Sequence, residues 1–197
     1  MIYADTSRQV LRQRSARWAT LLSDGVLMAL GALCVALFSQ VVIPLPFTPV
    51  PVTGQTLAVL LVGALLGSRR GAGSLLMYLG SGVMGLPVFS TGMAGLARLA
   101  GPTGGYLVGF VAAAFLVGLL CERWVARRPA ALLLVLAIGS AVIYLFGVSW
   151  LAVTVGAEKS LALGLAPFVP GDLLKISLAA VVLQSYRVFR SRSGETL

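Results

Sequence analysis

The stretch ERWVARRPAALLLVLAIGSAVIYLFGVSWLA, residues 122–152, decides the fold class. Three arginines stand near its beginning, at positions 123, 127 and 128, and an uninterrupted apolar run follows them. That run is long enough to cross a bilayer as a helix, which takes about 20 residues. An apolar run with arginines at one end is typical of a transmembrane helix whose arginine end lies in the cytoplasm. The stretch therefore predicts an integral membrane protein.

The same alternation of arginine clusters and apolar segments extends through the whole chain. Of the thirteen arginines, twelve lie before the first apolar segment, in two connections, or in the tail. Six apolar segments can be recognised, near 24–43, 54–68, 71–86, 103–121, 130–152 and 171–189. The basic clusters at both ends and in the second and fourth connections assign these parts to one side, the cytoplasm. We therefore expect an all-α membrane protein with six transmembrane helices and both termini cytoplasmic.

This prediction makes the chain, 1–197, a single membrane domain. A basic cytoplasmic leader would occupy 1–23, the six-helix bundle 24–189, and a polar cytoplasmic tail 190–197. The leader carries four arginines among apolar residues, so it either lies on the membrane surface as a helix or is a disordered segment that only sets the topology.

Composition excludes several classes of protein. The chain is 58% hydrophobic and 11% charged, with a mean hydropathy of +0.97, which does not describe a water-soluble domain. The net charge of +9 belongs to residues beside membrane spans, where they contact anionic lipid headgroups, so we expect no nucleic-acid partner. The chain has no histidine, which removes histidine-based catalysis and HExxH zinc sites, and it has no P-loop motif. We expect neither an enzyme nor a metal site.

The predicted external connections are 44–53, 87–102 and about 153–170, and they are not typical solvated loops. The first contains PLPFTPVP at 44–51, whose prolines make it stiff and extended. Such a segment is either a lid or a plain connector at the membrane surface. Two further motifs, GPTGGY at 101–106 and PGDLLK at 170–175, begin the fourth and sixth segments. They are either helix-start signals or places where the backbone approaches a ligand closely.

Outside the basic clusters the chain has three cations, which we assign to the external side. Two of them are costly at membrane depth. The three are Arg98, Lys159 and Lys175. Asp172 and Lys175 are three residues apart and share one helix face, so they form either a mutually neutralising pair or part of a binding site. Arg98 lies in an apolar loop just before GPTGGY. An ionisable residue at this depth is a candidate for function, and a surplus positive charge suits a substrate carboxylate.

Neutral polar groups accompany these charges on the external side. Gln55 offers an acceptor and two donors, which suit a urea or amide edge. Tyr78 and Tyr106 add aromatic faces and hydroxyls, although ordinary packing explains tyrosines at such positions equally well. Together these groups predict a pocket in the external half of the membrane for a small amphipathic anion.

The first segment carries a stripe of small residues, Ala29, Ala32 and Ala36. Small residues let helices pack closely in lipid. The stripe serves either packing within the bundle or docking to another membrane subunit.

Four ordered motifs resemble the BioY family, the biotin-specific substrate-binding (S) components of energy-coupling factor (ECF) transporters. They are PVPVTGQTL at 49–57, GLPVF at 85–89, GPTGGYLVGF at 101–110 and PGDLLK at 170–175, and the resemblance covers about 24–187. It implies a six-helix fold in the bacterial cytoplasmic membrane that binds biotin from the external side and needs no cofactor. It also implies a transmembrane coupling protein and two ATP-hydrolysing subunits as partners. Docking on the coupling protein would use Ala29, Ala32 and Ala36.

The resemblance places five residues in the biotin pocket: Gln55, Tyr78, Arg98, Asp172 and Lys175. One assignment gives the biotin carboxylate to Arg98 or Lys175, and the ureido ring to Gln55 and Asp172. The alternative has Asp172 and Lys175 bind the ureido group together and leaves the carboxylate to Arg98.

A different class of function stays open at this point, a transporter that works without dedicated ATPases. Secondary transporters usually show internal repeats and buried acidic groups for ion coupling. The two halves of the chain show no clear repeat, and apart from Asp172 no acidic residue lies deep in a predicted span.

Overall fold

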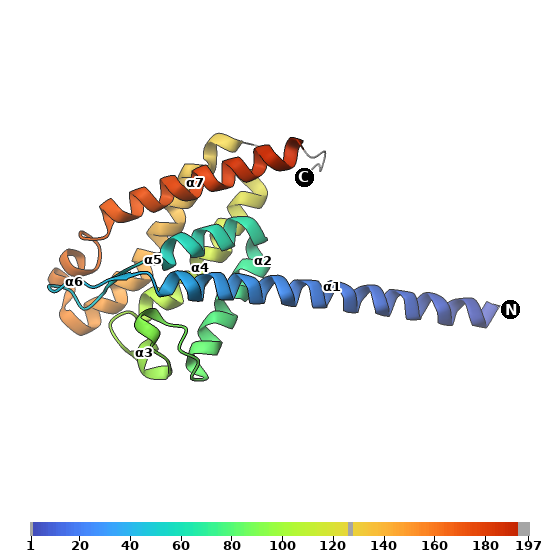
Figure 1. The fold of residues 1–197 in the computed structure, drawn as a ribbon, viewed down its shortest axis with the longest axis horizontal. Helices are drawn as coiled ribbons and strands as arrows, with labels where there is room; N and C mark the ends of the chain where they lie inside the picture. Colours follow the sequence, from blue (N-terminus) through green and yellow to red (C-terminus); the bar gives the residue numbers. More distant parts are fainter. Residues whose placement is uncertain (1, 126–127, 193–197) are drawn as a thin grey trace.

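The computed structural model describes residues 2–125 and 128–192. Five long helices form the body: α1 (Ile2–Ser39), α2 (Gln55–Val83), α4 (Gly104–Leu120), α5 (Leu132–Val155) and α7 (Val169–Arg192). Figure 1 shows the carboxyl-terminal part of α1 lying across the bundle, while its amino-terminal part extends away from the other helices. The shorter elements are β1 (Val42–Ile43), β2 (Val52–Thr53), η1 (Ser90–Gly92), α3 (Leu96–Ala100), η2 (Cys121–Val125, one π-helical turn), η3 (Pro129–Ala131) and α6 (Ala157–Gly164).

Four helices within the described ranges are long and apolar enough to cross a membrane, and the number rises to five if the bent pair α6 and α7 forms one broken span. The two halves of that pair meet at 48°. The predicted spans 54–68 and 71–86 are joined in α2, which is broken at Gly67. A mainly helical structure with several membrane-spanning candidates is therefore confirmed, while the six-span topology and the cytoplasmic position of both termini stay predictions.

The break in α2 is held in place by contacts with η2, the turn that follows α4. Gly67 has φ +81°, a left-handed conformation that favours glycine. The next residue, Ser68, donates its backbone N–H to Glu122 Oε1 at 2.7 Å and its hydroxyl to both oxygens of the same carboxylate. Glu122 thus caps the second half of α2, where a negative charge is favoured at a helix start.

Small residues let the two halves of α2 and α4 cross closely. A Cβ added to Gly71, in the second half, would lie 3.0 Å from the Cα of Gly63 in the first. A Cβ added to Gly63 would lie 2.7 Å from the carbonyl oxygen of Ala114 in α4. Helices in lipid approach each other most closely at such positions. The break at Gly67 therefore lets the two halves of α2 and helix α4 pack against one another at small residues.

Substitution of Gly67 by alanine is expected to destabilise the protein by about 2 kcal/mol, because the left-handed backbone is strained for alanine and its Cβ would meet Glu122 Oε1. Thermal unfolding in detergent measures the effect. Gly80→Ala is the matched control, because Gly80 lies in the same helix and its added Cβ would meet nothing within 4 Å. Equal melting temperatures for the two variants would contradict this account of the break.

Helix α4 lies at the centre of the core. It packs against α2 on one side and α5 on the other and buries Phe110, Ala113 and Val117. Helix α1 lies against the second half of α2, where a Cβ on Gly31 would meet the Ser74 side chain.

The outer face of α1 is apolar and exposed, as expected for a surface in contact with lipid. It carries Leu22, Val26, Leu30, Leu33 and Leu37. The predicted docking stripe is divided between the two faces: Ala29 is exposed, whereas Ala32 and Ala36 are partly buried and pack against the core. Their role in docking stays a prediction.

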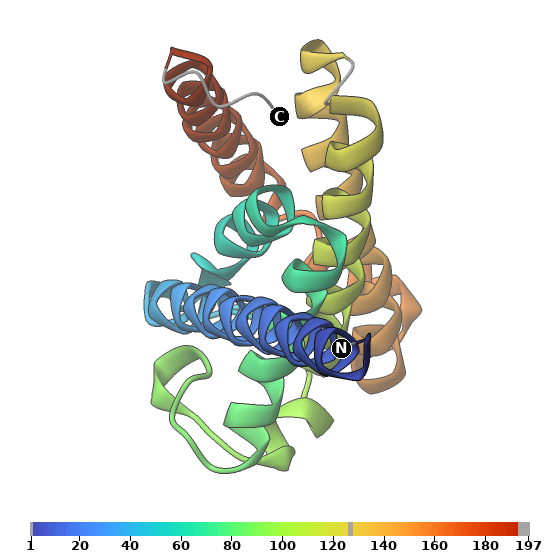
Figure 2. The ribbon, with the colours of Figure 1, turned by 90° about the vertical axis from the view of Figure 1, so that its right-hand side faces the viewer.

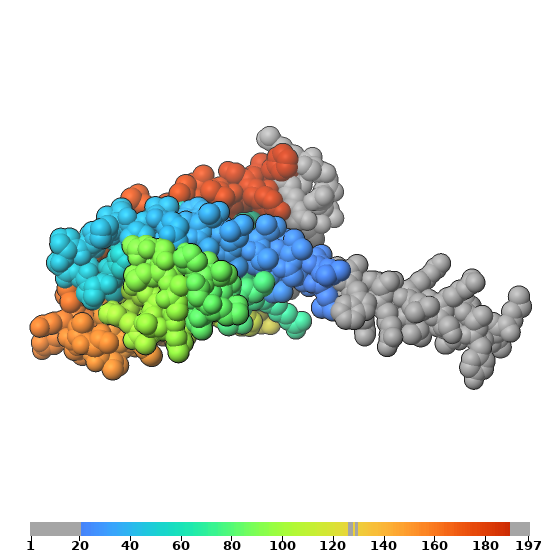
Figure 3. Space-filling view, turned by 60° about the horizontal axis from the view of Figure 1, so that its bottom comes forward, coloured from blue at the N-terminus to red at the C-terminus, as the bar shows by residue number. Residues whose placement is uncertain are grey.

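The three predicted external connections gather at one end of the molecule, the left-hand part of Figures 1 and 3. They are more ordered than loops: the first is a hairpin in which Val42 pairs with Thr53, the second contains α3, and the third contains α6. The tip of the hairpin reaches α6, where Thr48 Oγ1 donates to the Leu163 carbonyl at 2.7 Å. The carboxyl end of α7 and the start of α5 both lie at the opposite end of the bundle.

Candidate functional site

A small cavity lies where the three connections meet the bundle. Its volume is about 50 Å³. The hairpin, the start of α2, the α3 region, the start of α4 and α7 all contribute to its wall. The lining residues are Val50, Pro51, Thr53, Gln55, Thr56, Phe89, Ser90, Arg98, Thr103, Tyr106, Leu107, Phe110 and Lys175. The cavity therefore brings together Gln55, Arg98 and Lys175, three of the five residues that the sequence predicts for the site.

Arg98 is the cation of this cavity that has no acidic partner. It stands on the short helix α3 and is partly buried, and this burial lowers the pKa of its guanidinium. The guanidinium donates to Ser90 Oγ at 2.6 Å and lies 4.0 Å from the sulfur of Met93. No carboxylate in the described part of the chain forms an ion pair with it. Its positive charge therefore remains available to an anion in the cavity.

Lys175 is neutralised within the protein. Its Nζ lies 2.7 Å from Asp172 Oδ1, the pairing that a spacing of three residues on a helix predicts. Thr56 joins both partners, accepting from Lys175 Nζ at 3.0 Å and donating to Asp172 Oδ1 at 3.1 Å. Tyr144 donates its hydroxyl to Asp172 Oδ2 at 2.5 Å. The pair is thus a hydrogen-bonded network in which Lys175 reaches the cavity wall while Asp172 lies behind it.

Gln55 is held in place by two neighbours. Its Nε2 donates to the hydroxyl of Tyr78 at 2.6 Å, and its Oε1 accepts from Thr53 Oγ1 at 3.0 Å. Tyr78 is fully buried, and its ring meets Phe89 edge to face at 5.5 Å between centroids. It does not line the cavity. Tyr78 therefore positions Gln55 rather than forming the wall itself.

The start of α4 contributes Tyr106, which the sequence analysis named as a pocket candidate, and Thr103, which it did not. Tyr106 lines the cavity and donates its hydroxyl to the Gly164 carbonyl at 2.7 Å, which ties α4 to the end of α6. A Cβ on Gly105 would meet the Trp150 side chain, so this glycine of GPTGGY serves helix packing. Thr103 also lines the cavity, and its hydroxyl has no hydrogen-bond partner among the described residues.

Sequence reasoning also missed Tyr144 and Ser90, which hold Asp172 and Arg98. Neither stands in a motif or beside a charged residue in the sequence. Thr103, in contrast, lies inside the quoted motif GPTGGY, and a search of that motif for hydroxyl groups would have found it.

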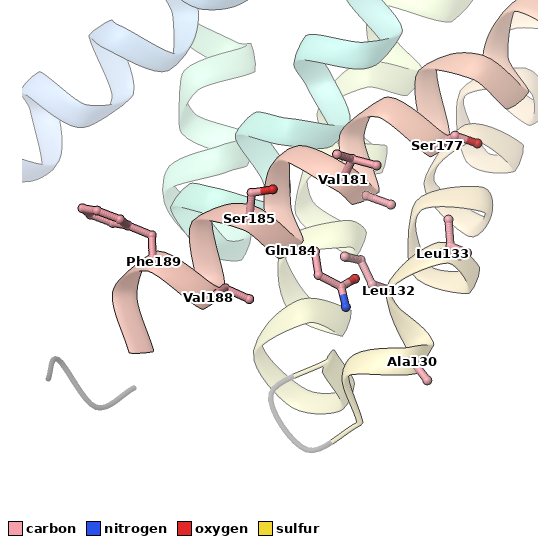
Figure 4. Close-up of a pocket in the computed structure, with 10 residues that line it drawn as sticks. Ala130, Leu132, Leu133, Ser177, Val181, Gln184, Ser185, Val188 and Phe189 are labelled. Carbon is pink, nitrogen blue, oxygen red and sulfur yellow. The ribbon is translucent and has the colours of Figure 1, made fainter. Parts of the chain in front are cut away.

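A larger groove, of about 800 Å³, lies away from this cavity, between α7 and the start of α5. Figure 4 shows Gln184 pointing toward α5, while Leu132, Leu133 and Val181 give the groove an apolar wall. Figure 2 shows how the end of α7 stands apart from α4 and α5 at this point. None of the five predicted site residues lines the groove. The cavity near Arg98 is therefore the better candidate for a ligand that carries a charge.

Comparison with known proteins gives concordant results. The model of the BioY family matches residues 9–192. The biotin transporter BioY of Rhizobium etli is 41% identical over 168 residues, which cover 81% of this chain and 90% of that protein. The probable biotin transporter BioY of Pyrococcus horikoshii is 39% identical over 158 residues, covering 80% and 93%.

The fold has a counterpart among solved structures. The crystal structure of an S-component for biotin from an ECF-type ABC transporter superposes with a TM-score of 0.78 and is 27% identical. The match covers 86% of this chain and 93% of that one. The family model and the relatives in sequence extend over most of the chain, and the solved structure matches its helices. By these criteria the chain belongs to the BioY family.

Proposed function

We propose that the chain binds biotin at the external side of the membrane and delivers it for uptake as the substrate-binding component of an ECF-type ABC transporter. The observation that carries this proposal is the cavity near Arg98. It offers one positive charge without an acidic partner, one amide and one neutralised ammonium, which together suit a ligand with a carboxylate and a neutral polar ring. The relatives named above are biotin transporters, and the structural counterpart is an S-component for biotin.

The geometry favours Arg98 over Lys175 for the carboxylate, and it changes both ureido assignments, because Asp172 does not line the cavity. Lys175 already has an anionic partner in Asp172, so its charge is compensated before a ligand enters. Arg98 has no such partner in the described residues. We therefore assign the biotin carboxylate to Arg98 and the ureido group to the side of the cavity with Lys175 and Gln55. Asp172 and Tyr78 position these two residues from behind.

The cavity must enlarge before biotin can enter. Its volume of about 50 Å³ is far below the ~300–1,000 Å³ of typical ligand pockets. Val50 and Pro51 of the proline-rich hairpin form part of its wall, and the hairpin tip touches α6 through Thr48. We propose that this hairpin is the lid, and that it moves away from the α2, α4 and α7 ends to admit the ligand.

The proposed topology places the three connections outside and both termini in the cytoplasm of a bacterial cell. Six passes require that the two halves of α2, separated at Gly67, count as separate short spans. The partners would be a transmembrane coupling protein and two ATPase subunits. Of the predicted docking residues, Ala29 is exposed on α1. Ala32 and Ala36 are partly buried against the core, so a partner subunit would contact only the exposed part of each.

Uptake of labelled biotin by cells that lack their own biotin transporter tests the proposal. We expect uptake when the chain is produced with an energy-coupling module, and we expect ATP depletion to abolish it. Uptake by the chain alone that is inhibited by an uncoupler and survives ATP depletion would contradict the S-component role and favour a stand-alone transporter. An Arg98→Gln variant produced at the same level is the control for non-specific entry.

A further inference from the structure

Thr103, the residue immediately before α4, has a buried hydroxyl without a partner. Its residue is 8% exposed, and Oγ1 makes no hydrogen bond with any described residue. A threonine at this position usually caps the helix with its side chain, but Thr103 makes no such bond. A buried hydroxyl is normally hydrogen-bonded, because leaving it without a partner is costly. Thr103 therefore carries an unused hydrogen-bonding group at the wall of the cavity.

Its surroundings favour a negatively charged partner. Thr103 stands at the amino-terminal end of α4, a helix of 17 residues, where the helix dipole attracts anions. Arg98 lines the same cavity and has no acidic partner in the described ranges. The guanidinium has five N–H donors, and its contacts with Ser90 and Met93 leave others available. Charge, hydroxyl and helix end thus all belong to residues that line the same cavity.

We propose that Thr103 is a specificity-determining residue that donates its hydroxyl to one oxygen of the biotin carboxylate, while Arg98 binds the same carboxylate by charge. This inference rests on the proposed function and extends it to a residue outside the predicted set. A hydrogen bond to an ionised oxygen is roughly twice as strong as one to a neutral oxygen. Thr103 therefore favours the ionised carboxylate over a neutral ester or amide of the same ligand.

Thr103→Val removes the hydroxyl and keeps the shape of the side chain. We expect it to weaken biotin binding by about 10- to 100-fold, as loss of a hydrogen bond to a charged group does. The unliganded variant should melt at the same temperature as the wild type or higher, because the hydroxyl had no partner to lose. Thr103→Ser, which keeps the hydroxyl, should bind biotin like the wild type. Titration calorimetry measures each affinity.

Ser140→Ala is the matched control. Ser140 lies on α5 and also has a buried hydroxyl without a described partner, but it does not line the cavity. We expect its removal to leave the affinity for biotin unchanged. An equal loss of affinity in Ser140→Ala and Thr103→Val would overturn the inference, because it would make the effect one of general packing.

Biotin methyl ester separates contact with the carboxylate from a structural role. The Thr103→Val variant should lose more affinity for biotin than for the ester, because the ester has no charged oxygen. Equal losses for both ligands, or binding of biotin within about twofold of the wild type, would overturn the inference and leave the proposed function intact. Failure of the wild type to bind biotin would overturn the proposed function and this inference with it.

Discussion

Replacement of Arg98 by glutamine is expected to weaken biotin binding by about 100-fold or more. Removing one member of a buried charge pair costs about 2–5 kcal/mol of binding free energy, and about 1.4 kcal/mol corresponds to a tenfold change. Glutamine is uncharged and can still donate to Ser90, the partner of Arg98 at 2.6 Å. The local fold of the α3 region should therefore survive. Equilibrium titration with biotin measures the loss.

Biotin methyl ester sharpens this prediction. The ester lacks the negative charge, so the Arg98→Gln variant and the wild type should bind it with similar, weak affinity. Lys159→Gln is the matched control for charge, since Lys159 is an exposed cation on α6 that does not line the cavity. If Arg98→Gln bound biotin with an affinity within about threefold of that of the wild type, the assignment would be contradicted. Lys175 would then be the residue that binds the carboxylate. An equal loss in Lys159→Gln would show a long-range effect of charge.

Replacement of Asp172 by asparagine is expected to reduce the free energy of unfolding by about 3 kcal/mol. The substitution leaves the ammonium of Lys175, whose side chain is 18% exposed, without its anionic partner. Breaking a buried ion pair by removing one partner typically costs about 3–5 kcal/mol, and the partial exposure of Lys175 places the expected value at the lower end. Thermal or denaturant-induced unfolding in detergent, followed by circular dichroism, measures the change.

A double variant separates stability from binding. Asp172→Leu combined with Lys175→Met replaces the ion pair with apolar side chains of similar size, and such replacements are often neutral in stability. We expect this variant to unfold close to the wild type but to bind biotin poorly, because the ureido group loses the ammonium at the cavity wall. An Asp172→Asn variant as stable as the wild type, or a double variant with full affinity, would contradict the role given to the pair.

The class of fold could be predicted because it depends on local composition. The arginine clusters and the apolar segments between them report the lipid environment directly. The predicted segments 103–121 and 130–152 agree closely with α4 and α5, whose bounds are Gly104–Leu120 and Leu132–Val155. These helices have clear starts and no internal break, so a window of about 20 residues describes them well.

The break in α2 could be placed only approximately. The sequence suggests a connection at Arg69 and Arg70, because charge marks the end of an apolar run. The structure puts the break at Gly67, where the Glu122 carboxylate caps Ser68. That contact joins residues 54 positions apart, and no local pattern records it. The short helices α3 and α6 were likewise not predicted, since each is shorter than a span and lies in an expected connection.

The candidate site was predicted as far as charge and motif allowed. Ionisable and amide groups at membrane depth are rare, so Arg98, Lys175 and Gln55 could be identified from the sequence. In the structure all three line one cavity. Their division of labour depends on partners that the sequence does not reveal. Tyr144, on α5, donates its hydroxyl to Asp172, which lies 28 positions later in the sequence. No motif in α5 marks this helix as part of the site. The choice between Arg98 and Lys175 required this geometry.

The most direct test of the account is titration of biotin into the detergent-purified chain alone, with biotin methyl ester in a parallel experiment. We expect saturable one-to-one binding of biotin without any partner subunit, and much weaker binding of the ester because the ester offers Arg98 no negative charge. No binding of biotin to a folded, monodisperse sample would contradict the proposed function. Equal binding of biotin and the ester would contradict the carboxylate site at Arg98.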